Sequence, residues 1–243
     1  MHLSTDSLDT FLGSQWVLWF DIDGTLVDSA GAGRRALMSA LKNVFGLTSP
    51  QCIPLHGRTD CGIFQDLCRI NQVSWSTESR ALLEAEYLRC LPRELAYDSG
   101  RILPGVLELL QKLTDSPHCR LGLLTGNIPP AAKLKLQAHV LWDFFEFGVF
   151  GDASPDRLDL APLALEKASS TLGLKPSADR VIVIGDTIDD IRLAQMMGVR
   201  SIAVCTGGGH RRELAAQGPH FIFDDLSDTE LILKILNCPD DGA

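Results

Sequence analysis

Two aspartates separated by a single residue follow an apolar run near the start of the chain. The run Trp16–Phe20 leads directly into Asp21, Ile22, Asp23 and Gly24. An uninterrupted apolar run predicts a strand that is buried on both faces, as in parallel sheets. Alternate side chains of a strand share a face, so both carboxylates can reach one pocket at its carboxyl end. Two carboxylates so close repel each other unless a cation or a proton lies between them, and the pair therefore predicts a metal.

Two further apolar runs end in polar residues of the same kind. Thr125 and Asn127 follow one run, and Asp186 follows another, with Asp190 one helical turn further on. The carboxyl ends of parallel strands lie at one edge of the sheet, so four carboxylates, a hydroxyl and an amide should meet there. Oxygen ligands without His or Cys suit Mg²⁺, which binds one or two protein carboxylates, waters and a substrate phosphate. A purely structural role is disfavoured, because buried charges are costly unless they are paired or metal-bound.

The segments that must position these residues alternate between strand and helix patterns after Pro104. Apolar runs predict strands at 119–124, 147–150, 181–184, 201–205 and 221–223, and helical spacing predicts helices at 106–113, 131–140, 161–172, 188–197, 213–217 and 229–236. This alternation indicates an α/β fold: a doubly wound parallel sheet, Rossmann-like, with right-handed crossovers.

Only helical patterns occur between the first strand and that alternating region. The spacing of apolar residues predicts helices around 36–45, 63–68 and 81–91. A strand followed by several helices and no returning strand is not a simple βαβ unit. We therefore expect a helical cap domain at 29–100, inserted after the first strand into a catalytic core of 1–28 and 101–243.

Composition and charge exclude several classes of protein. Of the 243 residues 45% are hydrophobic and 22% charged, which is typical of a globular protein. The net charge of -9 argues against nucleic acid or an anionic membrane surface as a partner, although a local site can still bind phosphate. No apolar run is long enough to span a membrane, and residues 1–14 lack the basic region of a secretory signal. We expect a cytoplasmic protein, either monomeric or dimeric.

At these positions the sequence resembles a known family. Asp-Ile-Asp-Gly-Thr-Leu-Val at 21–27, Thr-Gly-Asn at 125–127 and Gly-Asp-Thr-Ile-Asp-Asp at 185–190 are similar to the first, second and fourth motifs of the haloacid dehalogenase superfamily. Their order and their positions at strand ends also match. The helical insert resembles the cap of the phosphoglycolate-phosphatase-like branch of that superfamily.

The resemblance implies a Mg²⁺-dependent phosphatase that hydrolyses a phosphate monoester of a small metabolite through an aspartyl-phosphate. Asp21 would be the nucleophile, and Asp23 would be the general acid and then the general base. The metal would be bound by Asp21, by the backbone carbonyl of Asp23 and by Asp186. Asp190 would orient a metal-bound water or Asp186 itself.

The second motif would bind the phosphoryl group. Thr125 and the backbone N–H of Gly126 would contact phosphoryl oxygens, and Asn127 would help to fix the site. Phosphoryl transfer needs mainly positioning and neutralisation of the charge on the equatorial oxygens. These groups supply both.

The third motif of the family is a basic residue that offsets the carboxylates, and here several residues compete for that role. We favour Arg157, which precedes the helix predicted near Ala161 and could reach the sheet edge. Lys167 in mid-helix and Lys175 just after a glycine stop are the alternatives. Both lysines also fit a solvated surface, which is the commoner place for a lysine.

A loop of the insert contains Arg58, for which two interpretations remain open. Arg58 could point toward the active site and select an anionic leaving group. It could equally be exposed, with Thr59 or Asp60 serving only as a helix cap.

Other functions are compatible with parts of the sequence. A phosphomutase of the same superfamily would keep the motifs but shield the aspartyl-phosphate from water. A phospho-accepting regulatory module belongs to a different class, but such domains are shorter and lack a large helical insert. The glycines at 31–36 match a dinucleotide-binding pattern, yet they lie too far from the strand, and a hinge is favoured. Glycines 207–209 are interpreted as a flexible loop.

Overall fold

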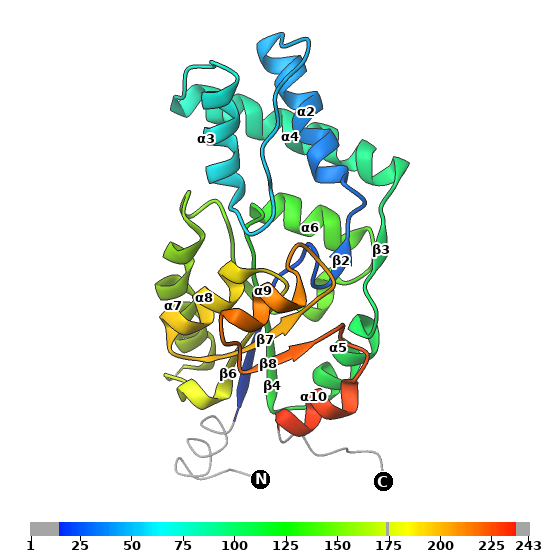
Figure 1. Ribbon diagram of the computed structural model, residues 1–243, viewed down its shortest axis with the longest axis vertical. Coiled ribbons are helices and arrows are strands. Elements are labelled where there is room, and N and C mark those ends of the chain that lie inside the picture. Colours follow the sequence, from blue (N-terminus) through cyan, green and yellow to red (C-terminus); the bar gives the residue numbers. More distant parts are fainter. Residues whose placement is uncertain (1–14, 174, 237–243) are drawn as a thin grey trace.

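The central feature of the computed structural model, which describes residues 15–173 and 175–236, is a sheet of six parallel strands in the order β5-β4-β1-β6-β7-β8 (Figure 1). The strands are β1 (Trp16–Phe20), β4 (Cys119–Leu124), β5 (Phe147–Val149), β6 (Val181–Gly185), β7 (Arg200–Val204) and β8 (Phe221–Phe223). The first strand lies in the middle, with Phe20 beside both Leu123 and Ile184. The chain extends the sheet first to one side of β1 and then to the other, so the strand order reverses at β1, where open α/β sheets bind ligands.

Helices cover both faces of this sheet, and the side chains of β1 show how. The helices of the core are α5 (Val106–Asp115), α6 (Pro129–Gln137), α7 (Leu160–Leu172), α8 (Ile188–Met197), α9 (Arg211–Ala216) and α10 (Thr229–Ile235). Leu18 and Phe20 pack in one core cluster with α5 and α10, whereas Val17 and Trp19 pack in another with α7 and α8. An apolar run without alternation predicts this two-sided burial. The predicted doubly wound α/β fold is confirmed.

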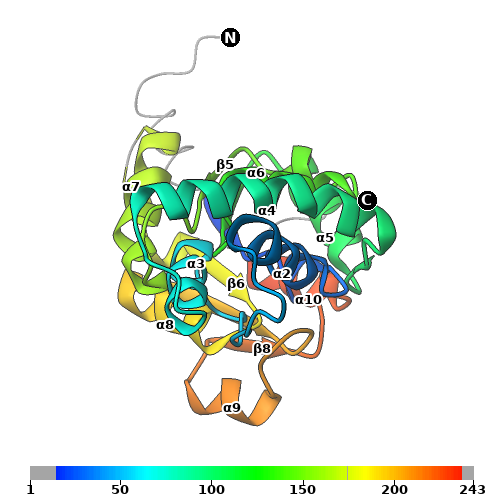
Figure 2. The same cartoon turned by 90° about the horizontal axis from the view of Figure 1, so that it is seen from above.

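Three helices and the loops that join them form a separate layer, which we call the cap layer, beyond the carboxyl ends of the strands (Figures 1 and 2). The helices are α2 (Ala32–Phe45), α3 (Asp60–Ile70) and α4 (Thr77–Tyr97). Local signals define their starts: Thr59 accepts a hydrogen bond from the Gly62 N–H, and Ser76 forms a capping box with Ser79. Their apolar faces share one core cluster with the start of α6. The division into domains at 29–100 stays a prediction.

The chain passes between the two layers through a short antiparallel ribbon that the sequence patterns do not reveal. Strands β2 (Val27–Asp28) and β3 (Arg101–Ile102) pair with each other where the chain leaves the core and returns. Gly100 has φ 75°, and a Cβ there would lie 1.7 Å from the Asp28 carbonyl oxygen, so only glycine fits. Strands of two residues carry no periodicity, which is why they escape sequence analysis.

Short 3₁₀ turns complete the core at Trp142–Phe144, Arg157–Asp159 and Ala178–Arg180. Within the two described ranges, none of the helices has the length and apolarity needed to cross a membrane.

Candidate active site

The first motif begins where β1 ends. The Asp21 N–H still donates to the Ile184 carbonyl, at 3.0 Å, so the backbone of Asp21 continues the sheet ladder. The chain then turns at Gly24, which has φ 88° and whose hypothetical Cβ would lie 2.5 Å from Oδ2 of Asp186. Glycine at this position lets the loop after β1 approach the end of β6 closely.

Three buried carboxylates meet at this edge of the sheet. One oxygen each of Asp21, Asp186 and Asp190 lies within 4.8 Å of the others. Burial and the neighbouring carboxylates of Asp21 and Asp190 raise the pKa of Asp186 well above its usual range. Burial also raises the pKa of Asp21 to about 6, although the guanidinium of Arg157 opposes the shift. The cluster holds more negative charge than one arginine balances, and its hard oxygen donors fit a divalent cation.

Arg157 is the basic residue inside this cluster. Its Nη2 lies 3.1 Å from Oδ1 of Asp21 and 2.5 Å from Oδ1 of Asp190, and the guanidinium is buried. The other two basic candidates are exposed: Lys167 lies on α7, and Lys175 lies beyond the end of that helix. The structure therefore brings Arg157, and neither lysine, into the acidic cluster.

Asp190 is held on both sides. Its Oδ1 accepts from Arg157, and its Oδ2 accepts from the Thr187 N–H at 3.0 Å and the Thr187 hydroxyl at 2.7 Å. The contact from the Thr187 N–H forms the capping box at the start of α8 together with the Asp190 N–H, which donates to the Thr187 hydroxyl at 3.4 Å. Asp190 is thus placed to hold Arg157 in the cluster and to shape the helix start next to Asp186.

Asp23 lies apart from that cluster, in a network of its own. Its Oδ1 accepts from the Ser29 hydroxyl at 2.7 Å, and its Oδ2 accepts from Nδ2 of Asn127 at 2.8 Å and Nζ of Lys135 at 2.5 Å. Burial would raise the pKa of Asp23, but Lys135, Asn127 and Ser29 together lower it below its usual value. The side chain is 36% exposed, so it can still meet a bound molecule.

The second motif follows β4 at the same edge. Thr125 is fully buried, and its hydroxyl accepts from the Asn127 amide at 3.0 Å. A Cβ on Gly126 would lie 2.0 Å from the Arg58 carbonyl oxygen of the cap layer. The loop can therefore pass beneath α3 only because this residue is glycine.

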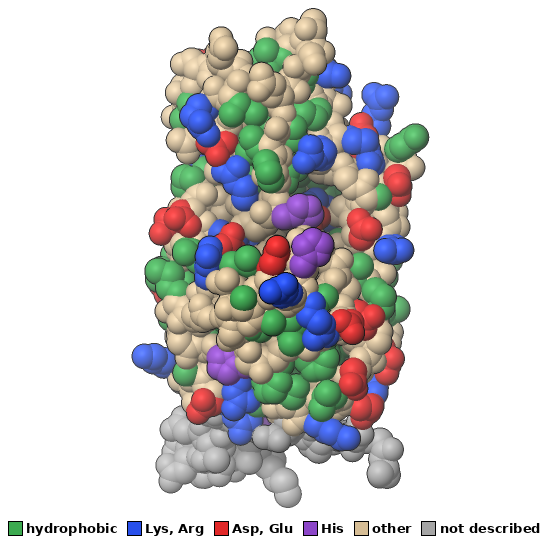
Figure 3. Space-filling view, viewed as in Figure 1, with side chains coloured by type: hydrophobic (Ala, Val, Ile, Leu, Met, Phe, Trp, Pro, Cys, Tyr) green, Lys and Arg blue, Asp and Glu red, His purple; other side chains and the backbone are tan. Residues whose placement is uncertain are grey.

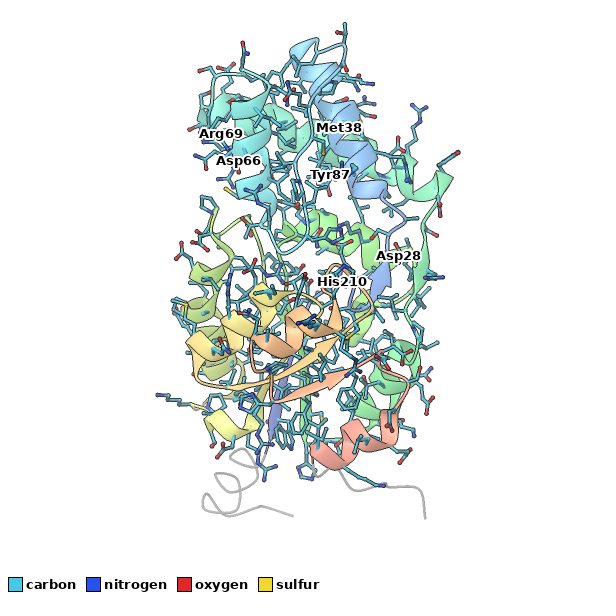
Figure 4. All side chains as sticks on the ribbon, viewed as in Figure 1. Asp28, Met38, Asp66, Arg69, Tyr87 and His210 are labelled. Carbon is cyan, nitrogen blue, oxygen red and sulfur yellow. The ribbon has the colours of Figure 1, made fainter. Side chains whose placement is uncertain are left out.

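A cavity of about 360 Å³ joins these groups between the sheet edge and the helical layer. The core contributes Asp21, Asp23, Thr125, Gly126, Asn127, Lys135 and Arg157, and the cap layer contributes Leu37, Arg58, Asp60, Ile63 and Tyr87 among others. Figure 4 shows Tyr87 in the cap layer and His210 in the core below it. On the face seen in Figure 3, histidine side chains gather near the level where the two layers meet.

The surroundings of Arg58 combine parts of the two interpretations that the sequence left open, a residue of the active-site wall and an exposed residue beside a helix cap. Thr59 does cap α3, and Arg58 lines the cavity. Its guanidinium is one-third exposed and pairs with Asp66 at 2.5 Å. Selection of a leaving group by Arg58 stays a prediction.

Two parts of the site were missed by sequence analysis. Lys135 on α6 is buried on the same helical face as Ala132 and Leu136, and a lysine at a core position of the apolar pattern was the available signal. The other is the loop at 207–209, interpreted only as flexible. The Gly208 N–H donates to Oδ2 of Asp186 at 2.8 Å, and a Cβ on Gly207 would lie 1.9 Å from the same oxygen. Three consecutive glycines shortly after a strand were the signal here.

The buried acidic cluster lies at the switch point of a doubly wound sheet, where α/β proteins of this architecture bind their ligands, and a helical layer covers it. The model of the haloacid dehalogenase-like hydrolase family matches residues 18–204, and the chain belongs to this family. It is 27% identical over 241 residues to the phosphoglycolate phosphatase of Salmonella choleraesuis (strain SC-B67), covering 90% of this chain and 92% of that protein.

Solved structures agree on the fold. A hydrolase from Pseudomonas syringae has a TM-score of 0.67 and 26% identity, covering 90% of this chain and 98% of its own. CbbY from Rhodobacter sphaeroides, solved in complex with xylulose-1,5-bisphosphate, has a TM-score of 0.70 at 19% identity, covering 88% and 96%. The predicted family and the predicted enzyme class, a phosphoric monoester hydrolase of the phosphoglycolate-phosphatase-like branch, are confirmed.

Proposed function

We propose that this hydrolase is a Mg²⁺-dependent phosphatase that cleaves the phosphate monoester of a small metabolite through an aspartyl-phosphate on Asp21. The observation that carries the proposal is the Asp21 carboxylate, buried beside Arg157 and two further carboxylates at the base of a cavity that Asp23 also lines. The cavity would then bring together the nucleophile, the proton carrier and the cation-binding cluster that the reaction needs.

The reaction would proceed in two displacements. An oxygen of Asp21 attacks phosphorus, the bond to the leaving oxygen breaks, and Asp23 donates a proton to that oxygen. Asp23 then accepts a proton from water, whose oxygen attacks phosphorus and releases inorganic phosphate and free Asp21. The lowered pKa keeps Asp23 ionised, which is the form that accepts the proton of water, and the negative charge of an incoming phosphate would raise this pKa toward the range that proton donation needs.

The remaining residues would position the phosphoryl group. The Thr125 hydroxyl and the Gly126 N–H would donate to phosphoryl oxygens, and Arg157 would offset the charge of Asp21 and Asp190. Mg²⁺, bound by the carboxylates of Asp21 and Asp186 and the carbonyl of Asp23, would neutralise charge on the phosphoryl oxygens. Asp190 would act through its contact with Arg157.

The cap layer would set the substrate. The cavity holds only a small molecule, and Arg58 on its wall would favour a leaving group that carries a negative charge. The resemblance to proteins named phosphoglycolate phosphatase supports a small anionic phosphate ester.

Hydrolysis of p-nitrophenyl phosphate and of a panel of phosphorylated metabolites, with Mg²⁺ and with EDTA, tests the proposal. We expect phosphate release that requires Mg²⁺ and falls at least about 1,000-fold in Asp21→Asn, since the nucleophile is lost. Asp224→Asn, a carboxylate that is 85% exposed, is the matched control and should keep full activity. Turnover that survives Asp21→Asn would refute the nucleophile, and a wild-type chain inactive on every ester would refute the function. Transfer of phosphate to a second sugar hydroxyl, in place of release, would instead indicate a phosphomutase.

A further inference from the structure

Lys135 is a buried cation beside the predicted proton carrier. It lies on α6, two helical turns beyond Asn127, and its side chain is 7% exposed. Its Nζ lies 2.5 Å from Oδ2 of Asp23 and 2.6 Å from Oδ1 of Asn127. Lys133, on the same helix, is exposed and lies over the ring of Trp142. The burial of Lys135 is therefore specific to its position and is not a property of the helix.

The amine of Lys135 lies at the wall of the cavity, close to the cap layer. A Cβ on Gly33 would lie 3.6 Å from Nζ and 3.7 Å from the Tyr87 hydroxyl, which are ordinary contact distances. Burying a lysine costs free energy that only close partners offset, and here the partners are Asp23 and Asn127. A leucine or methionine would satisfy the packing of α6 at lower cost, so packing alone does not account for a lysine.

The contacts of Lys135 fix the orientation of two other side chains. Because the ammonium group can only donate, it requires the oxygen of the Asn127 amide to face it. The Nδ2 of that amide then faces Asp23 and Thr125, to which it donates at 2.8 Å and 3.0 Å. Asp23 is one-third exposed and could otherwise rotate into the cavity; Lys135 and Asn127 hold its Oδ2 while Ser29 holds its Oδ1.

We propose that Lys135 is a positioning residue for proton transfer, which holds the Asp23 carboxylate and the Asn127 amide in the orientation that the leaving group and the attacking water require. This inference rests on the proposed function of Asp23. Lys135 lines the cavity, but its two short contacts are both made within the protein, so the inference gives it a positioning role, and the test below distinguishes that role from contact with the substrate.

The test compares two esters whose leaving groups differ in their need for a proton. p-Nitrophenolate departs without protonation, whereas the alkoxide of glycerol 2-phosphate does not. The ratio kcat/KM reports only the steps up to release of the first product, so the later role of Asp23 as a base does not enter. We expect Lys135→Met to lower kcat/KM for glycerol 2-phosphate about 100-fold and for p-nitrophenyl phosphate less than about 10-fold. Asp23→Asn should show the same pattern, and Lys133→Met should match the wild type.

Other patterns overturn the inference. Equal losses for both esters would mean that Lys135 is only structural, and unchanged rates would mean that it does nothing for Asp23. A raised KM confined to an ester with an anionic leaving group, such as phosphoglycolate, would make Lys135 a substrate ligand. If Lys135→Met does not fold, Lys135→Gln serves for the same comparison.

A crystal structure of the variant separates this inference from the proposed function, because it requires no activity. We expect the Asp23 carboxylate and the Asn127 amide to leave the orientations that they have beside Lys135. An Asp23 carboxylate unmoved in Lys135→Met would overturn the inference even in an active enzyme. A wild-type chain without phosphatase activity would refute the function instead.

Discussion

Asp60 is a buried carboxylate that links the cap layer to the loop after β4. Its N–H donates to the Gly126 carbonyl at 2.7 Å, and its Oδ2 accepts from the Ile128 N–H at 2.8 Å. Burial raises the pKa of Asp60 to about 6, against opposing effects of Lys135 and of the Ile128 hydrogen bond. The first residue of α3 thus contacts the backbone on both sides of Asn127.

Asp60→Asn should change the pH dependence of the free energy of unfolding. The folded protein binds a proton at Asp60 more tightly than the unfolded chain does, so the contribution of this group to stability is full below about pH 4. It is lost as the pH rises through 6. Asparagine keeps an acceptor for the Ile128 N–H but cannot ionise. The free energy of unfolding of the variant, relative to wild type, should therefore increase between pH 4 and 7. A pKa that is 3.8 in the unfolded chain and about 6 in the folded protein corresponds to a change of at most about 3 kcal/mol in the free energy of unfolding.

Urea unfolding of both proteins at a series of pH values measures this difference. Asp60→Ala is the control: it lacks the acceptor and should be less stable than Asp60→Asn throughout. A difference between Asp60→Asn and wild type that stays constant with pH would show that Asp60 titrates normally in the folded protein.

At the scale of elements, the start of α3 is the part of the cap layer that docks on the core. The Thr59 hydroxyl donates to the Pro155 carbonyl at 2.9 Å, and the Cys61 N–H donates to the Gly151 carbonyl at 3.3 Å. A Cβ on Gly62 would lie 2.4 Å from the Pro155 carbonyl oxygen. The loop after β5 therefore holds the start of α3 above the cavity, together with the loop after β4, whose Gly126 carbonyl accepts from the Asp60 N–H.

Gly62→Ala should loosen this docking without touching any residue of the acidic cluster. Alanine is favoured over glycine inside a helix by about 0.5–1 kcal/mol, so α3 itself should persist. The added methyl group must move the cap layer from the Pro155 loop, and we expect kcat/KM for a metabolite ester to fall roughly 10-fold or more. Steady-state kinetics and circular dichroism measure the two effects. Gln65→Ala, an exposed change on the same helix, is the control; identical kinetics of the two variants would contradict the docking role.

For the molecule as a whole, the excess negative charge at the sheet edge should make stability depend on a bound cation. A Mg²⁺ concentration about 100 times the dissociation constant should raise the free energy of unfolding by about 2.7 kcal/mol. For a chain of this size this corresponds to an increase of roughly 5–10 °C in Tm. The pKa of Asp186 is raised, so protons compete with the metal, and the increase should be smaller at pH 5 than at pH 7.5.

Thermal unfolding with Mg²⁺ and with EDTA at both pH values checks this expectation. Asp186→Asn should abolish the increase, while Asp224→Asn should keep it. An equal increase at both pH values, or one that survives Asp186→Asn, would place the cation elsewhere.

The α/β fold and the edge of the sheet at which the polar residues gather could both be predicted from the sequence. The reason is that apolar runs, helical spacing and strand-end positions are local properties. Asp21, Thr125 and Asp186 each follow a strand that is recognisable within about six residues, and a parallel sheet brings such ends together. The two-residue strands β2 and β3 have no local pattern and could not be predicted.

The side chains that complete the site are known only from the tertiary structure. The sequence favoured Arg157 but kept Lys167 and Lys175 as alternatives, and the packing of a 3₁₀ turn against α8 places Arg157 beside Asp190. Lys133 and Lys135 are both helical lysines in the sequence, and only the fold shows that Lys135 is buried and Lys133 exposed. A charge in a core position is satisfied by partners more than a hundred residues away, such as Asp23, and no local pattern encodes such a contact.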